Sequence, residues 1–188
     1  MKIKKILFIL LIAISLFILT GCPVINDNFS LESDTNYLLS INSISNDISV
    51  FNVDNIKVDA KSILTLPEDS QSNPMPNDIV KAGSYFFVIN SGDNSISVFD
   101  SYLNYLTKIN LGANKNPYSI HYDNSNLRLI VPNYVARNVS IISPNTLNIS
   151  STISISNSKT IQNCGISKDY YVILDTNLQD DWSFQDTK

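Results

Sequence analysis

An internal repeat constrains the fold of this chain more than any other feature. Four segments share one pattern: a short apolar run ending in Asn or Asp, a gap of about four residues, and a run in which polar and apolar residues alternate. The apolar runs cover residues 37–42, 85–90, 128–133 and 170–175, and the alternating runs cover 47–52, 95–100, 138–143 and 181–186. Their ends, Asn42, Asn90, Asn133 and Asp175, are 48, 43 and 42 residues apart. Self-similarity at this period indicates one supersecondary unit that stacks on copies of itself.

Each segment is predicted to be a β-hairpin. The alternating run Ile96-Ser97-Val98-Phe99 in the second segment has the two-residue period of a strand. Asn and Asp suit the end of the preceding strand, because their side chains bond the nearby backbone and tolerate unusual dihedral angles. The hairpins therefore form the centre of each unit.

Further strands are expected between the hairpins. Strand-like runs cover residues 62–66, 78–81, 105–111, 118–122, 147–155 and 160–166. Four strands in ~43 residues is the unit of a β-propeller blade. Helical periodicity is almost absent after Cys22, and β-branched residues are abundant. The sequence predicts an all-β fold, with a generic β-sandwich as the alternative to a propeller.

One repeat resembles a known family. Residues 85–100 read Tyr-Phe-Phe-Val-Ile-Asn-Ser-Gly-Asp-Asn-Ser-Ile-Ser-Val-Phe-Asp, which is similar to the YVTN repeat of surface-layer and related bacterial β-propeller proteins. Asn116-Pro117-Tyr118 is similar to the Asn-Pro-Tyr that precedes the next strand in that family. The first and third segments lack the turn glycine, and the fourth departs furthest. The resemblance implies a propeller domain over residues 36–188, with four-stranded antiparallel blades near 37–84, 85–127, 128–169 and 170–188.

The number of blades raises a question of closure. At ~43 residues per blade, residues 36–188 hold about three and a half blades, whereas propellers of this family usually close with about seven. We expect an incomplete propeller. Three explanations stay open: the chain is part of a longer reading frame, it closes as a four-bladed ring with strands borrowed from residues 26–36, or it completes itself by oligomerising.

The first 22 residues have the order of an export signal. Lys2, Lys4 and Lys5 precede an apolar run over residues 6–19, and small residues follow. Leu19, Thr20, Gly21 and Cys22 resemble the lipobox of bacterial lipoproteins. The resemblance implies that signal peptidase recognises Leu19, Thr20 and Gly21 and removes residues 1–21. It also implies diacylglyceryl and N-acyl groups on Cys22, with residues 22–35 as a linker. A retained transmembrane helix is the alternative, but a span needs ~20 apolar residues.

The expected localisation is the cell membrane or outer membrane, on the exported side. Without residues 1–21 the chain has ten basic and seventeen acidic side chains, a net charge of −7. The acidic residues are scattered, which argues against binding to nucleic acid and to anionic lipid. The lipid is then the only membrane contact expected, and two acyl chains are enough to hold a protein stably.

Few residues suggest catalysis. His121 is the one histidine of the chain, and no partner residues stand at metal-ligand spacing. Cys164 is left without a disulfide partner when Cys22 carries lipid, and its apolar neighbours predict burial. Asp93-Asn94 and Asp180-Asp181 offer oxygen atoms to Ca²⁺ but lack the spacing of a calcium loop. We expect no catalytic residue, metal or cofactor, and no enzyme.

A binding face can be argued from the propeller architecture. Two sets of loops should emerge on one face: the hairpin turns and the segments that lead to the next repeat. Their candidate binding residues are Gly92, Asp93, Asn94, Asn114, Asn116 and Arg137. Polar loops on a rigid scaffold often bind ligands, although they also serve as simple turns.

Three functions follow as hypotheses. The first is a binding or scaffold module at the cell envelope, with an envelope protein or a small ligand as its partner. The second is part of a propeller enzyme or periplasmic sensor whose active residues lie in other blades. The third is a non-functional remnant of a truncated gene.

Overall fold

The computed structural model describes residues 35–54, 62–67, 73–155, 160–167, 170–176 and 182–187. These residues form fourteen strands and no helix, which confirms the all-β prediction. The strands are β1 (Tyr37–Asn42), β2 (Asp47–Asn52), β3 (Ser62–Thr65), β4 (Pro76–Ala82), β5 (Tyr85–Asn90), β6 (Ser95–Asp100), β7 (Tyr105–Asn110), β8 (His121–Asp123), β9 (Arg128–Asn133), β10 (Asn138–Ser143), β11 (Asn148–Ser154), β12 (Ile161–Ser167), β13 (Tyr170–Thr176) and β14 (Trp182–Thr187).

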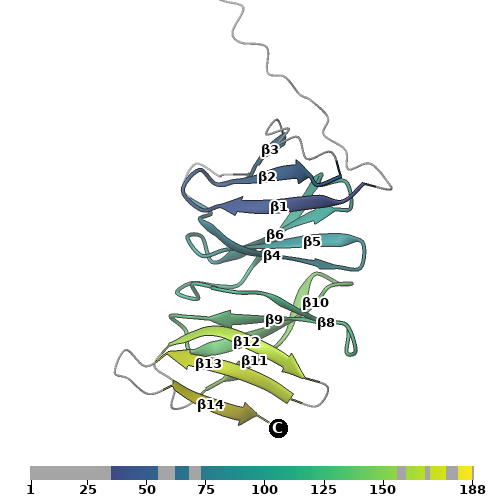
Figure 1. Cartoon of the computed structure of the whole chain (residues 1–188). Helices are drawn as coiled ribbons and strands as arrows, with labels where there is room; N and C mark the ends of the chain where they lie inside the picture. Colours follow the sequence, from purple (N-terminus) through teal and green to yellow (C-terminus); the bar gives the residue numbers. More distant parts are fainter. Residues whose placement is uncertain are drawn as a thin grey trace, which may run out of the picture.

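The strands form four antiparallel sheets that follow one another along the chain. Their orders are β1-β2-β3, β4-β5-β6-β7, β8-β9-β10-β11 and β12-β13-β14. Figure 1 shows the sheets stacked in chain order, with β1–β3 at the top and β12–β14 at the bottom. The two complete sheets have the four-stranded meander that the repeat predicts for a blade.

Each sheet begins one strand before the corresponding sequence repeat. The repeat begins at β5, whereas β4 pairs with β5 and is the first strand of that sheet. The first sheet thus has the second, third and fourth strands of a blade, and the last sheet has the first, second and third. Hairpin register explains the repeat, because Asn42, Asn90 and Asn133 face the first residues of the next strands across four-residue turns.

The fourth hairpin departs from this register. Asp175 does not end its strand: β13 continues to Thr176, which pairs with Trp182. The predicted strand over residues 118–122 is also shorter than expected, because β8 covers only His121–Asp123 and Pro117 joins the sheet through an isolated bridge to Asn133.

Three apolar layers hold the sheets together. In β5, Phe86 and Val88 pack toward the first sheet, while Phe87 and Ile89 pack toward the third. Successive side chains of a strand point to opposite faces, so a strand between two sheets is apolar at every position. This is why residues 85–89 form a continuous apolar run. A third layer around Ile130 lies between the third and fourth sheets.

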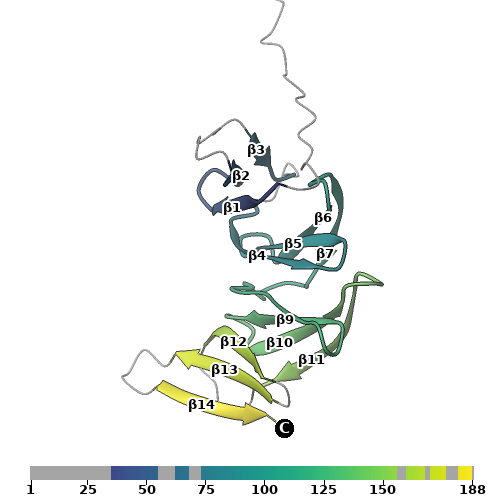
Figure 2. The same ribbon diagram turned by 45° about the vertical axis from the view of Figure 1, so that its right-hand side comes forward.

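Leu38 marks the outer face of the first sheet. It occupies the position of Phe86 in the repeat, but it is 59% exposed whereas Phe86 is 8% exposed. No described residue covers this face as the first sheet covers Phe86. In Figures 1 and 2 the first and last sheets lie at opposite ends of the stack, so the described residues do not close into a ring.

Candidate functional site

The hairpin turns join neighbouring sheets through one asparagine. Asn94 ends the β5–β6 turn with a φ of +57°. Its side-chain Oδ1 accepts hydrogen bonds from the backbone N–H groups of Lys115 and Asn116, at 2.8 and 2.7 Å. Its backbone oxygen accepts a bond from the N–H of Leu111. Asn tolerates positive φ better than most residues, so one residue both closes the turn and holds the segment that leads to β8.

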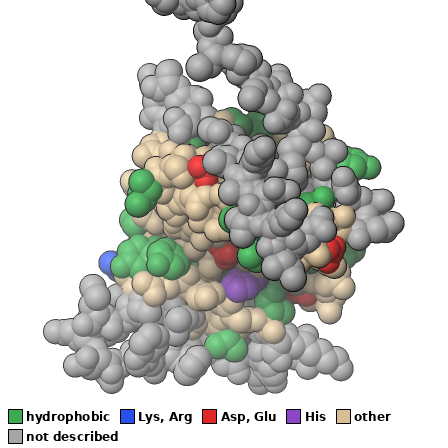
Figure 3. Space-filling view, turned by 45° about the horizontal axis from the view of Figure 1, so that its top comes forward, with side chains coloured by type: hydrophobic (Ala, Val, Ile, Leu, Met, Phe, Trp, Pro, Cys, Tyr) green, Lys and Arg blue, Asp and Glu red, His purple; other side chains and the backbone are tan. Residues whose placement is uncertain are grey.

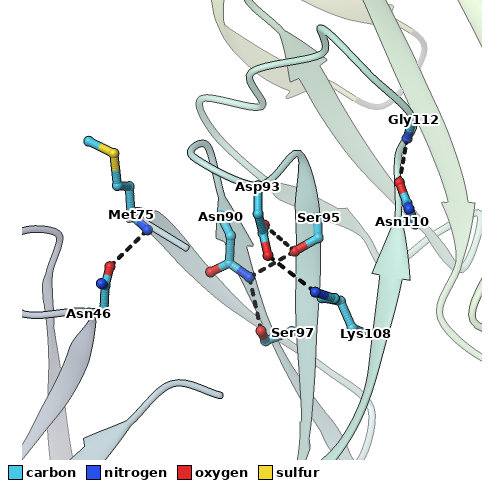
Figure 4. A network of polar contacts seen from close by, with 9 residues as sticks. All are labelled: Asn46, Met75, Asn90, Asp93, Ser95, Ser97, Lys108, Asn110 and Gly112. Atoms are coloured by element: carbon cyan, nitrogen blue, oxygen red, sulfur yellow. Dashed lines mark hydrogen bonds and ion pairs between the residues drawn. The ribbon is translucent and has the colours of Figure 1, made fainter. Parts of the chain in front are cut away.

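The first sheet repeats this arrangement. Asn46 has a φ of +54°, and its Oδ1 accepts a bond of 2.8 Å from the N–H of Met75. Figure 4 shows this bond reaching from the first sheet to the segment before β4. The backbone oxygen of Asn46 accepts from Leu66, as that of Asn94 accepts from Leu111. Asn46 and Asn94 are therefore linkers between blades.

Arg137 occupies the same position in the third sheet but lacks the side-chain link. Its φ is +53°, and its backbone oxygen accepts a bond from Ile155. Its side chain is exposed and forms no hydrogen bond with the part of the chain that the structure describes. Its polar group is therefore available to solvent or a partner.

Gly92 and Asp93 also have structural roles. A Cβ atom on Gly92 would lie 2.1 Å from the backbone oxygen of Asn73, so this close approach requires glycine. The Asp93 carboxylate accepts a bond from Ser95 and lies 3.4 Å from the ammonium of Lys108. Asp93, Ser95 and Lys108 are drawn in Figure 4.

The predicted binding loops do lie together on one face. The turn residues Tyr134 and Val135 donate backbone bonds to the oxygens of Asn116 and Lys115, next to the bonds from Asn94. Asn114 lies in the same segment, is exposed and has a φ of +57°. The Asp93 and Asn94 side chains are used within the fold, whereas no hydrogen bond joins the Asn114, Asn116 or Arg137 side chain to the described residues. The ligand site on this face stays a prediction.

A second polar group lies on, or just before, the first strands of the last three sheets. Asp78 faces Ile89 across its strand pair, and Asn163 faces Leu174 in the same way. Ser119 lies two residues after Pro117, which bridges Asn133 as Pro76 pairs with Asn90. Asp78, Ser119 and Asn163 therefore occupy one equivalent position in three successive blades. We call them the inner-strand residues.

Hydrogen bonds connect the inner-strand residues from blade to blade. Oδ2 of Asp78 accepts a bond of 3.0 Å from the N–H of Ile120. Oγ of Ser119 lies 3.1 Å from the backbone oxygen of Gln162 and 3.3 Å from Oδ1 of Asn163. These contacts follow the stacking direction, so the three residues form a polar row along the inner edges of the sheets.

His121 joins this row. Its Nε2 lies 2.6 Å from Oδ1 of Asn163, and because that oxygen is an acceptor, Nε2 carries the proton. Asn163 is exposed, and His121 is half-buried. The sequence alone offers His121 no partner at metal-ligand spacing. The structure places it beside an exposed amide, where it can also contact a ligand.

Cys164 lies next to the row but is not reactive. It is 3% exposed and free, which confirms the expected burial. Burial, with a further contribution from the negative charge of Asp78, raises the pKa of the Cys164 thiol to about 12. The thiol is thus protonated at neutral pH and is a poor nucleophile.

Sequence reasoning missed the inner-strand residues although a signal was present. Asp78 and Asn163 each precede the next hairpin, at Tyr85 and Tyr170, by seven residues. Ser119 precedes Arg128 by nine, because the β8–β9 turn has two more residues than the β4–β5 turn. This difference in turn length hid the equivalence of Ser119 with Asp78 and Asn163.

Several predictions concern residues outside the described part of the chain. Leu19, Thr20, Gly21 and Cys22 lie there, as does Asp180-Asp181. Among the described residues, no group of three or more His, Cys, Asp or Glu side chains is placed to hold a metal, and no helix has the length and apolar character of a membrane span. On the face in Figure 3, acidic side chains lie apart from one another, and the histidine is visible in purple.

Comparison with known proteins finds similar solved structures but no similar sequence family. No protein family matches the chain, and no curated protein matches it. Virginiamycin B lyase from Staphylococcus aureus, in an inactive form with quinupristin, is 12% identical in sequence and has a TM-score of 0.66. The match covers 85% of this chain and 54% of the lyase. Hydrazine synthase from Kuenenia stuttgartiensis is 13% identical with a TM-score of 0.64, over 85% and 47%.

Dihydro-heme d1 dehydrogenase NirN, in complex with DHE, is 16% identical with a TM-score of 0.56, over 79% of this chain and 32% of its own. These structures are β-propeller-like. The chain has a β-propeller fold. It spans between a third and about half of the length of these propellers. At such low identity the likeness concerns the fold, and it transfers no activity.

Proposed function

We propose that this protein is a lipid-anchored β-propeller of the cell envelope that acts as a binding or scaffold module. The observation that carries the binding role is the row of inner-strand residues, which places one polar side chain from each of three blades at the same position, with Ser119 buried, Asp78 half-buried and Asn163 exposed. Rigid sheets hold these side chains, and Asn163 is open to solvent. Such a preorganised polar surface suits a small polar ligand or the backbone of a peptide.

The proposed anchor is the lipid on Cys22. Its support is the order of charges, apolar residues and small residues in residues 1–22. Replacement by Cys22→Ala should move the protein from the membrane fraction to the soluble fraction and remove the lipid mass. A membrane-bound Cys22→Ala protein would contradict the proposed anchor.

Binding is tested on the full chain by a thermal-shift screen with small polar molecules and short peptides from the cell envelope. A hit should lose its effect in the variant Asn163→Ala, which removes the exposed amide of the row. The matched control is Asn148→Ala, because Asn148 is also an exposed strand asparagine but lies on the outer strand β11. A ligand that responds equally to both changes does not bind at the inner-strand residues.

A propeller enzyme or sensor is the second candidate function. Its support is limited to the fold, since the solved propellers with the same architecture include a dehydrogenase, a synthase and a lyase. In this proposal the reacting groups lie in further blades, and the inner-strand residues form one side of the site. Intact-mass analysis of the native protein distinguishes the two candidates, because a larger lipid-bearing protein is expected only when further blades exist.

A further inference from the structure

The turn between β9 and β10 departs from the repeat at its first and last positions. The β5–β6 turn begins with Ser91 and ends with Asn94, and the β1–β2 turn, residues 43–46, likewise begins with serine and ends with asparagine. The β9–β10 turn begins with Tyr134 and ends with Arg137 instead. The side chains of Ser91 and Asn94 bond to the segments between blades, whereas no hydrogen bond joins the Tyr134 or Arg137 side chain to the described residues. The described fold therefore makes no polar use of these two replacements.

Tyr118 brings a second aromatic ring to this turn. It occupies the position of Asn77 in the second sheet, because each follows a proline that pairs with the asparagine at the end of the first hairpin strand. The ring centroids of Tyr118 and Tyr134 are 6.2 Å apart, and the ring planes are tilted by 35°. Tyr118 is 46% exposed, and Tyr134 is half-buried. Exposed tyrosines combine an apolar ring with a polar hydroxyl group, which makes them common at binding surfaces.

The same turn carries positive charge in an acidic chain. Lys115 lies in the segment that bonds to the turn through the N–H of Val135. Its ammonium lies 3.3 Å from Oδ1 of Asn138, the residue directly after the exposed Arg137. Residues 112–118 and 133–138 contain no Asp or Glu, whereas the whole chain has seventeen acidic and thirteen basic residues. A negatively charged partner is thus attracted to this turn more than to the acidic remainder of the chain.

We propose that Tyr118, Tyr134 and Arg137, which we call the tyrosine–arginine patch, bind an acidic peptide segment of another protein. The planar guanidinium of Arg137 suits a carboxylate of the peptide, which it can bind through two parallel hydrogen bonds. The two rings cover an apolar side chain next to that carboxylate. Tyrosine and arginine are among the residues that contribute most often to the hot spots of protein–protein interfaces. The patch includes none of the inner-strand residues and does not depend on lipid at Cys22.

The apolar part of this turn favours a peptide over a polysaccharide or a nucleic acid. Val135 lies in the same turn, is 51% exposed and adds aliphatic surface to it. An apolar side chain of a peptide can cover such surface, whereas the hydroxyl groups of a polysaccharide would give up hydrogen bonds to water against it. Nucleic acid requires clustered basic residues, and this turn has only Lys115 and Arg137 nearby.

Selection from a library of short random peptides on the full chain tests the patch. Enriched peptides should carry Asp or Glu next to an apolar residue. Their affinity, measured by fluorescence anisotropy, should fall ~10-fold or more in Arg137→Asn and in the double variant Tyr118→Asn with Tyr134→Ser. Binding should also weaken as the salt concentration rises, because salt screens exposed charges. These substitutions introduce the residues that the second sheet has at the same positions, so the variants should fold, and thermal unfolding checks this.

The matched control is Tyr102→Ser, because Tyr102 is 56% exposed but lies in the β6–β7 turn. This variant should bind the enriched peptides as tightly as the unsubstituted chain. The proposal is overturned if no peptide is enriched, if the enriched peptides lack acidic residues, or if the patch variants and the control bind equally.

Two further measurements separate this proposal from its alternatives. Alginate, a carboxylated polysaccharide, is the second probe. If alginate binds through the patch and no peptide does, the surface is a glycan site and the peptide proposal is wrong. Asn163→Ala is the second variant, and it should leave peptide affinity unchanged. Loss of peptide binding in Asn163→Ala alone would assign the peptide to the inner-strand residues, so the two proposed surfaces are tested separately.

Discussion

The side-chain oxygen of Asn94 lies 2.7 Å from the backbone nitrogen of Asn116 and so ties the β5–β6 turn of one blade to the segment that leads to β8 in the next. The same atom accepts a bond from Lys115. Side-chain packing, the connecting segment and a few hydrogen bonds, such as that from Ile120 to Asp78, hold a blade against its neighbour. A turn residue that bonds this segment sets the position of the next blade along the stack.

Substitution of Asn94 tests this link. Asn94→Ala should lower the free energy of unfolding by ~2–3 kcal/mol, because it leaves two backbone donors unpaired and places alanine at positive φ. Arg137→Ala at the equivalent turn should change it by less than ~0.5 kcal/mol, since this exposed side chain has no hydrogen bond in the described part of the chain. Denaturant unfolding of both variants is the measurement, and similar losses would contradict the role of the Asn94 amide.

Two leucines with positive φ should respond in opposite directions to glycine. Leu127 has a φ of +50° and is 54% exposed, whereas Leu103 has a φ of +64° and is 3% exposed. Leu127→Gly should raise the free energy of unfolding by ~0.5–1 kcal/mol, because it relieves the backbone strain and gives up little packing. Leu103→Gly should lower it by ~2–4 kcal/mol through loss of a buried side chain. Thermal unfolding that moves both variants the same way would contradict this account.

Acid should destabilise the fold through two turn aspartates. Burial raises the pKa of Asp123, but hydrogen bonds from Asn126 and Arg128 and the charge of Arg128 outweigh it and hold the pKa below the ordinary value of 3.8. Burial likewise opposes the shift at Asp100, where bonds from Asn104 and Tyr102 hold the pKa low.

A carboxyl group with a lowered folded-state pKa stabilises the protein fully above its unfolded value, and the contribution disappears as the pH falls through the folded value. The contribution of these two groups to the free energy of unfolding should therefore be constant from neutral pH to ~5 and decrease below ~4. Asp123→Asn should make this decrease shallower. Urea unfolding at a series of pH values tests this. If the free energy of unfolding falls as steeply at low pH in the variant as in the unsubstituted protein, the role of Asp123 is ruled out.

The Cys164 thiol should not react in the folded protein. Its pKa of about 12 keeps it protonated at pH 8, and burial blocks access. Alkylation with iodoacetamide, followed by mass analysis of the peptide that contains Cys164, should give little product until denaturant is added. Rapid labelling without denaturant would show that the fourth sheet opens easily.

The strands were largely predictable, and their assembly into sheets was less so. Residues 85–100 show both strands and the turn, because a sheet buried on both faces needs apolar side chains at every position of its first hairpin strand. The inner strands were harder to place. Strand β8 has three residues and follows a bridge at Pro117, so its sequence has little alternation to recognise.

The candidate site was predicted in part. The loops with Gly92, Asn94, Asn116 and Arg137 do share one face, but the Asn94 amide serves the fold, and local sequence does not show which oxygen bonds to which distant N–H. The inner-strand residues were missed, since Asp78, Ser119 and Asn163 differ in type and come together only through strand register.

The amino-acid sequence determined the hairpins, the turn positions and the period of the blades, because these depend on alternation and on residues such as Asn94 that tolerate special backbone angles. Only the tertiary structure decided which strand begins each sheet and which side chains form the polar row. Those properties arise from pairing between residues far apart in the chain. Asp78 meets Ile120, and His121 meets Asn163, across distances of 42 residues along the sequence.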